Sequence, residues 1–222
     1  MARRLRINST KQQIIRESTS QMIENGYTNT TFRCIAKALD INPGLITFYF
    51  PTKEHLLALL VDRLCDFQWR LMYSVADDGV DSLLALALEL MAMASVAEEK
   101  ESAKDFFVSA YQSSMCLELI QQNDTLRAKQ IFTLYNPTWN DVDFRSAEAL
   151  VSGIEYATLN TNAYSPDLEM RIAAAITAIF RIYNVPDNVI SEKIEKVSQM
   201  DYRAVGHRIF KEFKEYIDSE NK

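Results

Sequence analysis

The sequence predicts an all-α protein with an N-terminal head of three short helices, a long connecting helix and a larger helical body. Only five glycines and five prolines interrupt 222 residues, and the stretches between them space their apolar residues by three, four and seven. No pair of alternating segments flanks a tight turn, so the sequence carries no β-hairpin signal. With 48% hydrophobic and 24% charged residues, the chain has the composition of an ordinary globular protein.

The first helix of the head is expected to begin at Ser9 and to end near Asn25-Gly26. The Ser9 hydroxyl would cap its start while Gln12 reaches back to the backbone, and Gly26 is a favoured C-terminal stop. A second, short helix follows Thr30 or Thr31. Its apolar face consists of Phe32, Ile35, Ala36 and Leu39.

A tight turn, Asp40 to Asn42, separates the second helix from a third. Asn42 is expected to cap the third helix and Pro43 to occupy its first position, where a missing N–H costs little. This helix should run to about Tyr49. The small core of the head is assigned to Ile41, Ile46 and Phe50.

A fourth helix is expected to start after Thr52, as its cap, and to run to about Tyr73. In the body, apolar spacing predicts helices over 81–98, 102–135 with a break, 140–164, 167–184, and 188–218 with a break near 199–201. The most apolar stretch, Leu83 to Ala97, is shorter than the ~20 residues that span a membrane and is expected to be a buried central helix. We therefore expect two domains, residues 1–52 and 53–222, with 53–73 as the connecting helix.

Charge is unevenly distributed between these two parts. Residues 1–53 contain eight Lys and Arg against three acidic residues, a balance of +5, whereas the remainder carries −11. A basic head on an acidic body suits a protein that brings one end to phosphates. A short helix, a tight turn and a second short helix on such a head have the layout of a helix-turn-helix, although helix pairs of this kind also occur as plain packing units.

The residues of the head add an identity to this layout. Those that follow the order and spacing of the TetR family are Gly26-Tyr27, Thr30-Thr31, Ile35-Ala36, Gly44, Tyr49-Phe50, and Lys53-Glu54 with Leu56-Leu57. Over residues 10–57 the chain therefore resembles the TetR family of transcriptional regulators. The rest of the chain resembles that family only in length and helical character.

The resemblance implies a ligand-responsive regulator, a repressor by family habit, that binds a palindromic operator in double-stranded DNA. The residues that it places toward DNA are Thr31, Arg33, Gly44, Thr47, Phe48, Tyr49 and Lys53. The alternatives left open are that Phe48 or Tyr49 belongs to the core and that Lys53 is an ordinary solvated lysine. Arg3, Arg4 and Arg6 form an arm, expected to be flexible, that enters a minor groove, adds non-specific attraction or is only a solvated tail.

Three residues depart from the family pattern. Asp40 stands where the turn commonly has glycine, and a short polar side chain tolerates a left-handed conformation there. Thr47 stands where a tyrosine is frequent, and Leu45 where many members have a small polar residue. The second helix of the motif is therefore expected to favour hydroxyl and apolar contacts.

A single head of this kind binds weakly, so a two-fold homodimer is expected. Dimerisation is assigned to helices over 145–164 and 167–183, because the corresponding pair in the TetR family forms a four-helix bundle with its mate. The candidate stripes are Ala147, Leu150, Ile154 and Ala157 on the first helix, and Ile172, Ala175, Ile176, Ile179 and Tyr183 on the second.

Most large side chains of the body are expected to be core, and a minority to line a pocket for an unidentified small-molecule effector, apolar or aromatic in character. Candidate pocket residues are Met91, Phe107, Tyr111, Met115, Tyr135, Trp139 and Tyr156. Tyrosine hydroxyls or Glu89 would orient the ligand. By the resemblance, the ligand shifts the fourth helix and changes the separation of the two heads.

An enzyme is the alternative from another class, but no catalytic, metal or cofactor site is expected. His55 and His207 do not have metal-ligand spacing, and the isolated glycines form no phosphate loop. The segment Asn140–Asp143 is expected to cap a helix rather than to bind a metal. A helical interaction protein without a DNA role is the third interpretation.

The three cysteines, Cys34, Cys65 and Cys116, lie far apart in apolar helical contexts. They are expected to be reduced core thiols of a cytoplasmic protein. The N-terminus lacks the apolar segment of a secretory signal, and no membrane association is expected.

Overall fold

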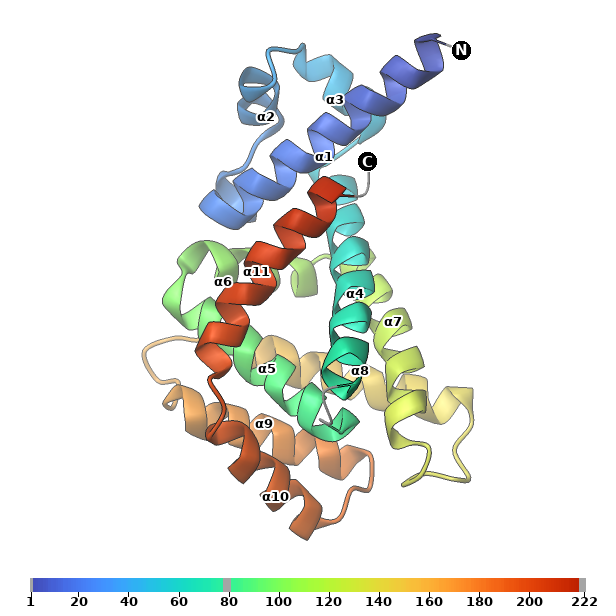
Figure 1. The fold of residues 1–222 in the computed structure, drawn as a ribbon, viewed down its shortest axis with the longest axis vertical. Helices are drawn as coiled ribbons and strands as arrows, with labels where there is room; N and C mark the ends of the chain where they lie inside the picture. The colour runs from blue at the N-terminus through green and yellow to red at the C-terminus, as the bar shows by residue number, and fades with distance from the viewer. Residues whose placement is uncertain (1, 78–80, 220–222) are drawn as a thin grey trace.

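The computed structural model describes the backbone of residues 2–77 and 81–219, with side chains over 9–71 and 81–219. Within these ranges the chain is entirely helical, which confirms the predicted fold class (Figure 1). The first four helices are α1 (Ala2–Asn29), α2 (Phe32–Ala38), α3 (Pro43–Tyr49) and α4 (Lys53–Asp77). The others are α5 (Ser82–Glu99), α6 (Glu101–Gln112), α7 (Ser114–Phe132), α8 (Asp141–Leu159), α9 (Leu168–Ile182), α10 (Asp187–Ser198) and α11 (Tyr202–Ser219).

Helix α1 differs from its prediction at one end and agrees at the other. It begins at Ala2, so the expected start and cap at Ser9 are wrong; the preceding residues contain no glycine or proline that would stop the helix. Near its C-terminus, Gly26 has φ 85° and ψ 165°, which interrupts the helical backbone at the predicted stop. Glycine adopts this conformation without steric cost.

Two of the helices of the body, α7 and α8, begin at polar residues whose side chains cap them. Ser113 divides the predicted 102–135 segment, because its Oγ accepts a hydrogen bond from the Cys116 N–H at 3.3 Å. Asn140 caps α8, with the Asp143 carboxylate accepting from the Asn140 N–H, as expected. The predicted break near 199–201 separates α10 from α11.

Helix α5 occupies the centre of the body. It contacts α6, α9, α10 and α11, and most of its side chains are buried, which confirms the central helix predicted over Leu83 to Ala97. Helix α11 approaches α5 most closely at Gly206, where a Cβ atom would lie only 2.6 Å from the Ala92 carbonyl oxygen. Among the described residues, no helix is long and apolar enough to cross a membrane.

Helices α4, α6 and α11 join the N-terminal helices to the body (Figure 1). Helix α4 extends downward from the head, as predicted, and α11 lies beside α1 and contacts it. The Arg16 guanidinium donates to the Asp218 carbonyl at 2.8 Å, and the Lys214 ammonium pairs with Glu24 at 3.0 Å. The C-terminal helix therefore also holds the head, next to α6, whose Phe107 ring packs on Phe210 of α11.

The cysteines do not share one environment. Cys65 and Cys116 are buried, as expected, but Cys34 is exposed, so its assignment to the core is wrong. It precedes the buried pair Ile35-Ala36 in α2, and a helix of seven residues has only one narrow inner face.

We expect Gly206→Ala to destabilise the protein, because its Cβ would collide with the α5 backbone. Overpacking of this kind costs about 1–3 kcal/mol, whereas alanine at an uncrowded helix position stabilises by about 1 kcal/mol relative to glycine. A lower free energy of unfolding for the variant, measured by urea titration, would therefore confirm that Gly206 lies against the α5 backbone. A stabilised variant would contradict it.

Candidate nucleic-acid interface and cavity

Helices α2 and α3 form a compact helix-turn-helix with capped ends. Thr31 is the cap of α2, its Oγ1 accepting from the Cys34 N–H at 3.2 Å, and Asn42 caps α3 by accepting from the Gly44 N–H at 2.8 Å. Between them Asp40 has φ 52°, the left-handed conformation expected of this turn residue. The local chemistry predicted for this segment is therefore confirmed.

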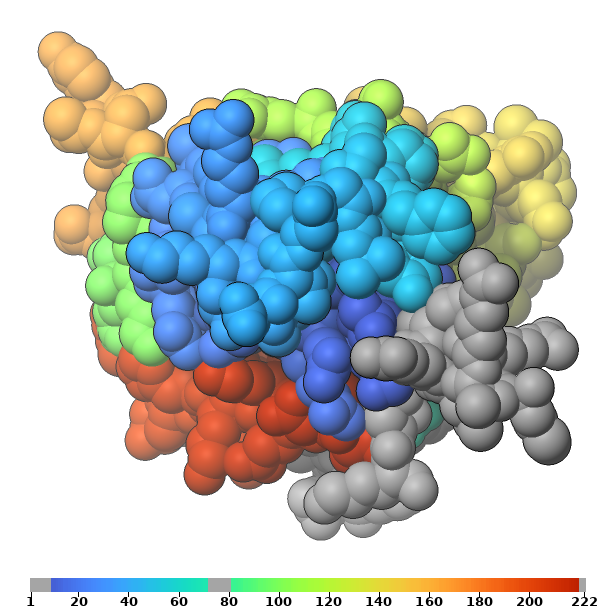
Figure 2. Space-filling view, turned by 90° about the horizontal axis from the view of Figure 1, so that it is seen from above, coloured from blue at the N-terminus to red at the C-terminus, as the bar shows by residue number. Residues whose placement is uncertain are grey.

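The motif has a buried inner side and an exposed outer side. Ile35, Ala36, Ile46 and Phe50 are buried and Ile41 is half-buried, which confirms the core assigned to the head. The residues of the predicted DNA-facing set that are exposed are Thr31, Arg33, Gly44, Thr47 and Phe48. Figure 2 views the molecule from the side on which these helices lie.

Phe48 and Tyr49 differ in exposure. The Phe48 side chain is 74% exposed, whereas Tyr49 is half-buried and meets the Phe48 ring edge-on at 5.2 Å between centroids. An exposed phenylalanine on a DNA-facing helix provides an apolar surface for a thymine methyl group. Of the two aromatic residues, Phe48 is thus the one that points away from the core.

Lys53 makes contacts that the sequence did not indicate. Its ammonium donates to the Tyr27 carbonyl at 2.8 Å and lies 4.0 Å from the centroid of the Tyr27 ring. Burial lowers the pKa of Lys53. The lysine therefore ties the start of α4 to the end of α1 and is not simply solvated.

The end of α1 is also anchored to α6. Asp105 accepts hydrogen bonds from the Thr28 N–H at 2.7 Å and the Thr28 hydroxyl at 2.6 Å. The Ser102 hydroxyl donates to the Ile23 carbonyl at 2.9 Å. A Cβ at Gly26 would lie 2.5 Å from the Asp105 carboxylate, so glycine is required both by the backbone angle and by this contact.

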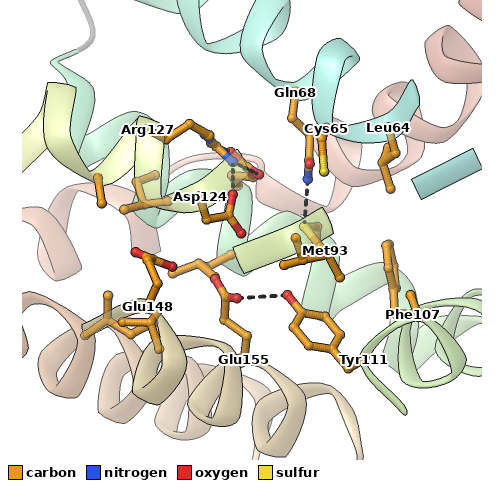
Figure 3. A pocket seen from close by; sticks show the side chains of 18 of the residues that line it. Leu64, Cys65, Gln68, Met93, Phe107, Tyr111, Asp124, Arg127, Glu148 and Glu155 are labelled. Carbon is orange, nitrogen blue, oxygen red and sulfur yellow. Dashed lines mark hydrogen bonds and ion pairs between the residues drawn. The ribbon is translucent and has the colours of Figure 1, made fainter. Parts of the chain in front are cut away.

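A cavity lies in the body among α4, α5, α6, α7, α8 and α9 (Figure 3). The empty space inside it, counted together with the solvent at its opening, is about 810 Å³. Apolar and aromatic side chains dominate its wall, among them Leu64, Met93, Phe106 and Phe107. The space is therefore suited to a ligand with an apolar body.

Ionisable side chains also line this cavity. Arg127 is paired with Glu89 by two hydrogen bonds, one of them at 3.1 Å, and contacts Asp124 at 3.4 Å. Two further carboxylates, Glu148 and Glu155, accept hydrogen bonds from tyrosines. Tyr183 donates to Glu148, and Tyr111 donates to Glu155 at 2.8 Å.

Burial and mutual repulsion perturb these carboxyl groups. Burial, together with the negative charge of Asp124, raises the pKa of Glu148 to about 8. The same two causes raise the pKa of Glu155 well above its ordinary range. Burial raises the pKa of Asp124 to about 6 against the opposing effect of Arg127. The cavity therefore holds carboxyl groups that bind protons near neutral pH.

Comparison with known proteins identifies the head. Residues 14–60 match the family model described as bacterial regulatory proteins, tetR family. The head of the chain is therefore similar to the N-terminal part of TetR family regulators. The matched region contains α2, α3 and the start of α4.

No curated protein matches this chain significantly. A solved structure titled gamma-butyrolactone receptor (ArpA like protein) matches with a TM-score of 0.42 and 17% identity, covering 93% of this chain and 99% of that one.

The structure brings only part of the predicted pocket set together. Phe107 and Tyr111 line the cavity. The predicted residues that do not line it are Met91, Met115, Tyr135, Trp139 and Tyr156. They were chosen for size and adaptability, but such side chains serve equally in packing: Met91 is buried within the core, and Trp139 packs on Phe144 and Tyr183.

Apart from Glu89, which was named from the sequence and lines the cavity, the charged residues of the cavity were missed by sequence reasoning. Glu148 and Glu155 lie seven residues apart on α8, which places them on one helix face together with Val151. That spacing was visible in the sequence. What it did not show is that this face is turned inward, because acidic residues normally mark a solvated face.

The side chains of Arg3, Arg4 and Arg6 lie outside the residues whose side chains the structure describes. Their backbone belongs to α1, so the expected flexible arm is helical here. Their role toward a minor groove stays a prediction.

We expect the protein to lose stability as the pH rises from about 5 to 9, in part through Glu148. The pKa of this group is raised on folding, to about 8, so its contribution is complete below the unfolded pKa of about 4.3 and is lost as pH rises through the folded value. Each pH unit in this window costs at most about 1.4 kcal/mol from one such group. Glu148→Gln should flatten the slope of unfolding free energy against pH.

Glu195→Gln is the matched control, because Glu195 is exposed on α10. That variant should keep the slope of the parent protein. Equal slopes for the parent and Glu148→Gln would show that Glu148 titrates alike in folded and unfolded chains.

Proposed function

We propose that this protein is a TetR family repressor that binds a palindromic operator as a homodimer and is released by a small ligand. The observation that carries the proposal is the shared use of α6. One part of that helix holds the end of α1 through Asp105, and another lines the cavity through Phe106, Phe107 and Tyr111. A ligand that moves α6 therefore acts directly on the attachment of the head.

The proposed DNA contacts follow from the outer side of the motif. Arg33 supplies charge toward phosphates, the Thr47 hydroxyl reaches a base edge or phosphate, and Phe48 meets a thymine methyl group. Lys53 already donates to carbonyls of α1. Because an ammonium has three donors, Lys53 retains one for a phosphate.

The proposed dimer uses the exposed faces of α8 and α9. On α9 the residues predicted for this role are wrong, because Ile172, Ala175, Ile176, Ile179 and Tyr183 are buried within the protomer. Ala147 of α8 is likewise buried, but Leu150 is 63% exposed. The exposed apolar residues of the two helices are Val142, Ala149, Leu150 and Ala157 on α8, and Met170 and Ala174 on α9.

This exposed set has the features of a helix-bundle interface. Leu150 and Met170 are large apolar side chains left in solvent by the protomer, and the alanines between them permit close approach of a second pair of helices. A two-fold axis through this face pairs each patch with its own copy. The dimer then has two heads, one for each of two DNA half-sites that lie one or more helical turns apart.

The ligand's effect is a shift between two states. Binding in the cavity releases DNA only if the ligand prefers the state whose heads fit the operator poorly. Helix α4 provides a second route, because it begins in the head at Lys53 and lines the cavity at Leu64 and Gln68. The Ser113 hydroxyl, which donates to Glu54 at 2.6 Å, ties the start of α4 to the junction of α6 and α7.

We expect the protein to shift a DNA fragment from upstream of its own gene in an electrophoretic assay, and Arg33→Ala to weaken that binding. Loss of one phosphate contact from each protomer should reduce affinity by about tenfold or more and lower the salt dependence by about two counterions per dimer. Lys196→Ala, at an exposed position on α10, is the control for loss of charge far from the motif. If no palindrome in the fragment is bound in a salt-sensitive manner, the proposed function fails.

Thr47→Ala and Phe48→Ala are expected to change sequence preference rather than overall affinity. Both side chains are exposed on α3, so neither truncation empties the core. Binding should be compared across operator variants with single base-pair changes, where a lost base contact removes discrimination worth about 1–3 kcal/mol at one position. An equal loss of affinity for all operator variants would indicate that both residues contact the DNA backbone instead of the bases.

Leu150→Arg is expected to dissociate the dimer into monomers, because it places a charge in the apolar centre of the proposed interface. Molar mass from light scattering should fall by half, and operator affinity should fall with it. Leu126→Arg is the control, since Leu126 is 56% exposed on α7, outside the α8 and α9 faces. A dimer that survives Leu150→Arg would place the interface elsewhere.

A further inference from the structure

The cavity has an excess of carboxyl groups over positively charged side chains. Four carboxyl groups line it, Glu89, Asp124, Glu148 and Glu155, and Arg127 is the one lining residue with a positive side chain among those described. The Arg127 guanidinium is already paired with Glu89 and Asp124. Glu148 and Glu155 receive only the hydroxyl protons of Tyr183 and Tyr111.

We propose that the effector is an organic cation with an apolar or aromatic body, its positive nitrogen held between Glu148 and Glu155. This inference rests on the proposed function and names the chemical class of the ligand. Glu148 and Glu155 both point into the cavity from α8, near Tyr111 and Asp124 (Figure 3). Phe106, Phe107 and Met93 supply the apolar wall on which the body packs.

An anionic ligand has no unused cation to meet in this cavity. Arg127 is neutralised by Glu89, and bringing a second anion close to four carboxyl groups is electrostatically unfavourable. A metal ion is also a poor match, because no three acidic, histidine or cysteine side chains among the described residues are grouped as metal ligands. An organic cation satisfies both the charge and the apolar surface.

A second observation points to a ligand in the same place. The Nε–H of Arg127 is buried without a hydrogen-bond partner among the described residues, although the side chain is almost fully enclosed. A buried donor left unpaired costs free energy. A ligand oxygen that accepts from this group gains a bond that the protein itself does not supply, so the site is built to receive polar atoms as well as apolar ones.

Protonation adds a signature that packing alone does not produce. The groups facing Glu148 and Glu155 are Cys65 of α4, Glu89 of α5, Tyr111 of α6, Asp124 and Arg127 of α7, and Tyr183 after α9. Because the pKa of Glu148 is raised to about 8, its carboxyl is mostly protonated at neutral pH. A bound cation favours the ionised form, so binding releases protons and affinity rises with pH.

The test compares three probes of similar size: phenyltrimethylammonium, its uncharged isostere tert-butylbenzene, and phenylacetate. Binding to the full-length protein without DNA is measured by calorimetry and thermal shift. We expect the cation to bind about tenfold or more tightly than the isostere, a difference of about 1.4 kcal/mol, and phenylacetate to bind most weakly. Cation affinity should increase from pH 6 to pH 9, whereas tert-butylbenzene affinity should not change.

Variants locate the effect. Glu148→Gln and Glu155→Gln, singly and together, should remove the preference for the cation while leaving tert-butylbenzene affinity within about threefold, and Glu195→Gln should behave as the parent protein. If a glutamine variant fails to fold, proton release by the parent protein, obtained from calorimetry in buffers of different ionisation enthalpy, still decides the question.

Preferred binding of the neutral or anionic probe, no binding of any probe, or cation binding without proton release would each overturn the inference. These outcomes are separate from the proposed function, because none of the measurements includes DNA. A protein that shifts its operator but does not favour the cation keeps the proposed function and loses the inference. A protein that favours the cation but binds no operator loses the proposed function and keeps the preference of the cavity for a cation.

Discussion

The position of the head depends on the Asp105 carboxylate, which receives the chain where α1 ends. At Gly26 the helix stops, and the next turn presents the Thr28 N–H and hydroxyl to the two oxygens of Asp105. A side chain at residue 26 would displace this carboxylate. The contact is therefore available only to a chain with glycine at that position, and it fixes the direction in which α2 and α3 leave α1.

Several other contacts converge on the same region. Lys53 donates to the carbonyl of Tyr27, so the start of α4 is held against the same turn. From α11, Lys214 pairs with Glu24 of α1. The head is thus fixed between α4, α6 and α11, and two of these helices, α4 and α6, also line the cavity. In the proposed mechanism, these two helices carry a change in the cavity to the head.

The head was predictable from the sequence because its signals are local. Pro43 after a capping Asn42, glycine at 26 and a short polar residue at the left-handed turn each specify backbone geometry within a few positions. The start of α1 could not be predicted, because no residue before Ser9 carries a signal that marks the beginning of a helix. The apolar stripe of α9 was wrongly assigned to the dimer interface. Apolar spacing shows that one side of a helix is buried, but it does not show whether that side packs against the same chain or against a second chain.

The cavity was the least predictable feature, because it depends on which of many large side chains fail to fill a space. Seven candidates were chosen by size, and only Phe107 and Tyr111 line it. Its acidic groups come from α5, α7 and α8, and no local pattern announces that they meet. The contacts among these acidic groups depend on how the three helices pack, which the sequence alone does not show.

The acidic residues of α8 are best understood from what they cost. Apart from Ser152 and Thr158, the other buried residues of this helix are apolar, namely Phe144, Ala147, Val151 and Leu159, so apolar side chains at 148 and 155 would pack there without a desolvation penalty. Carboxyl groups in this setting either remain protonated or pay that penalty, and their tyrosine partners offset only part of it. Residues that break the local pattern at a cost in stability are expected where a site binds something. The two glutamates therefore mark the part of the cavity that is shaped for a ligand rather than for folding.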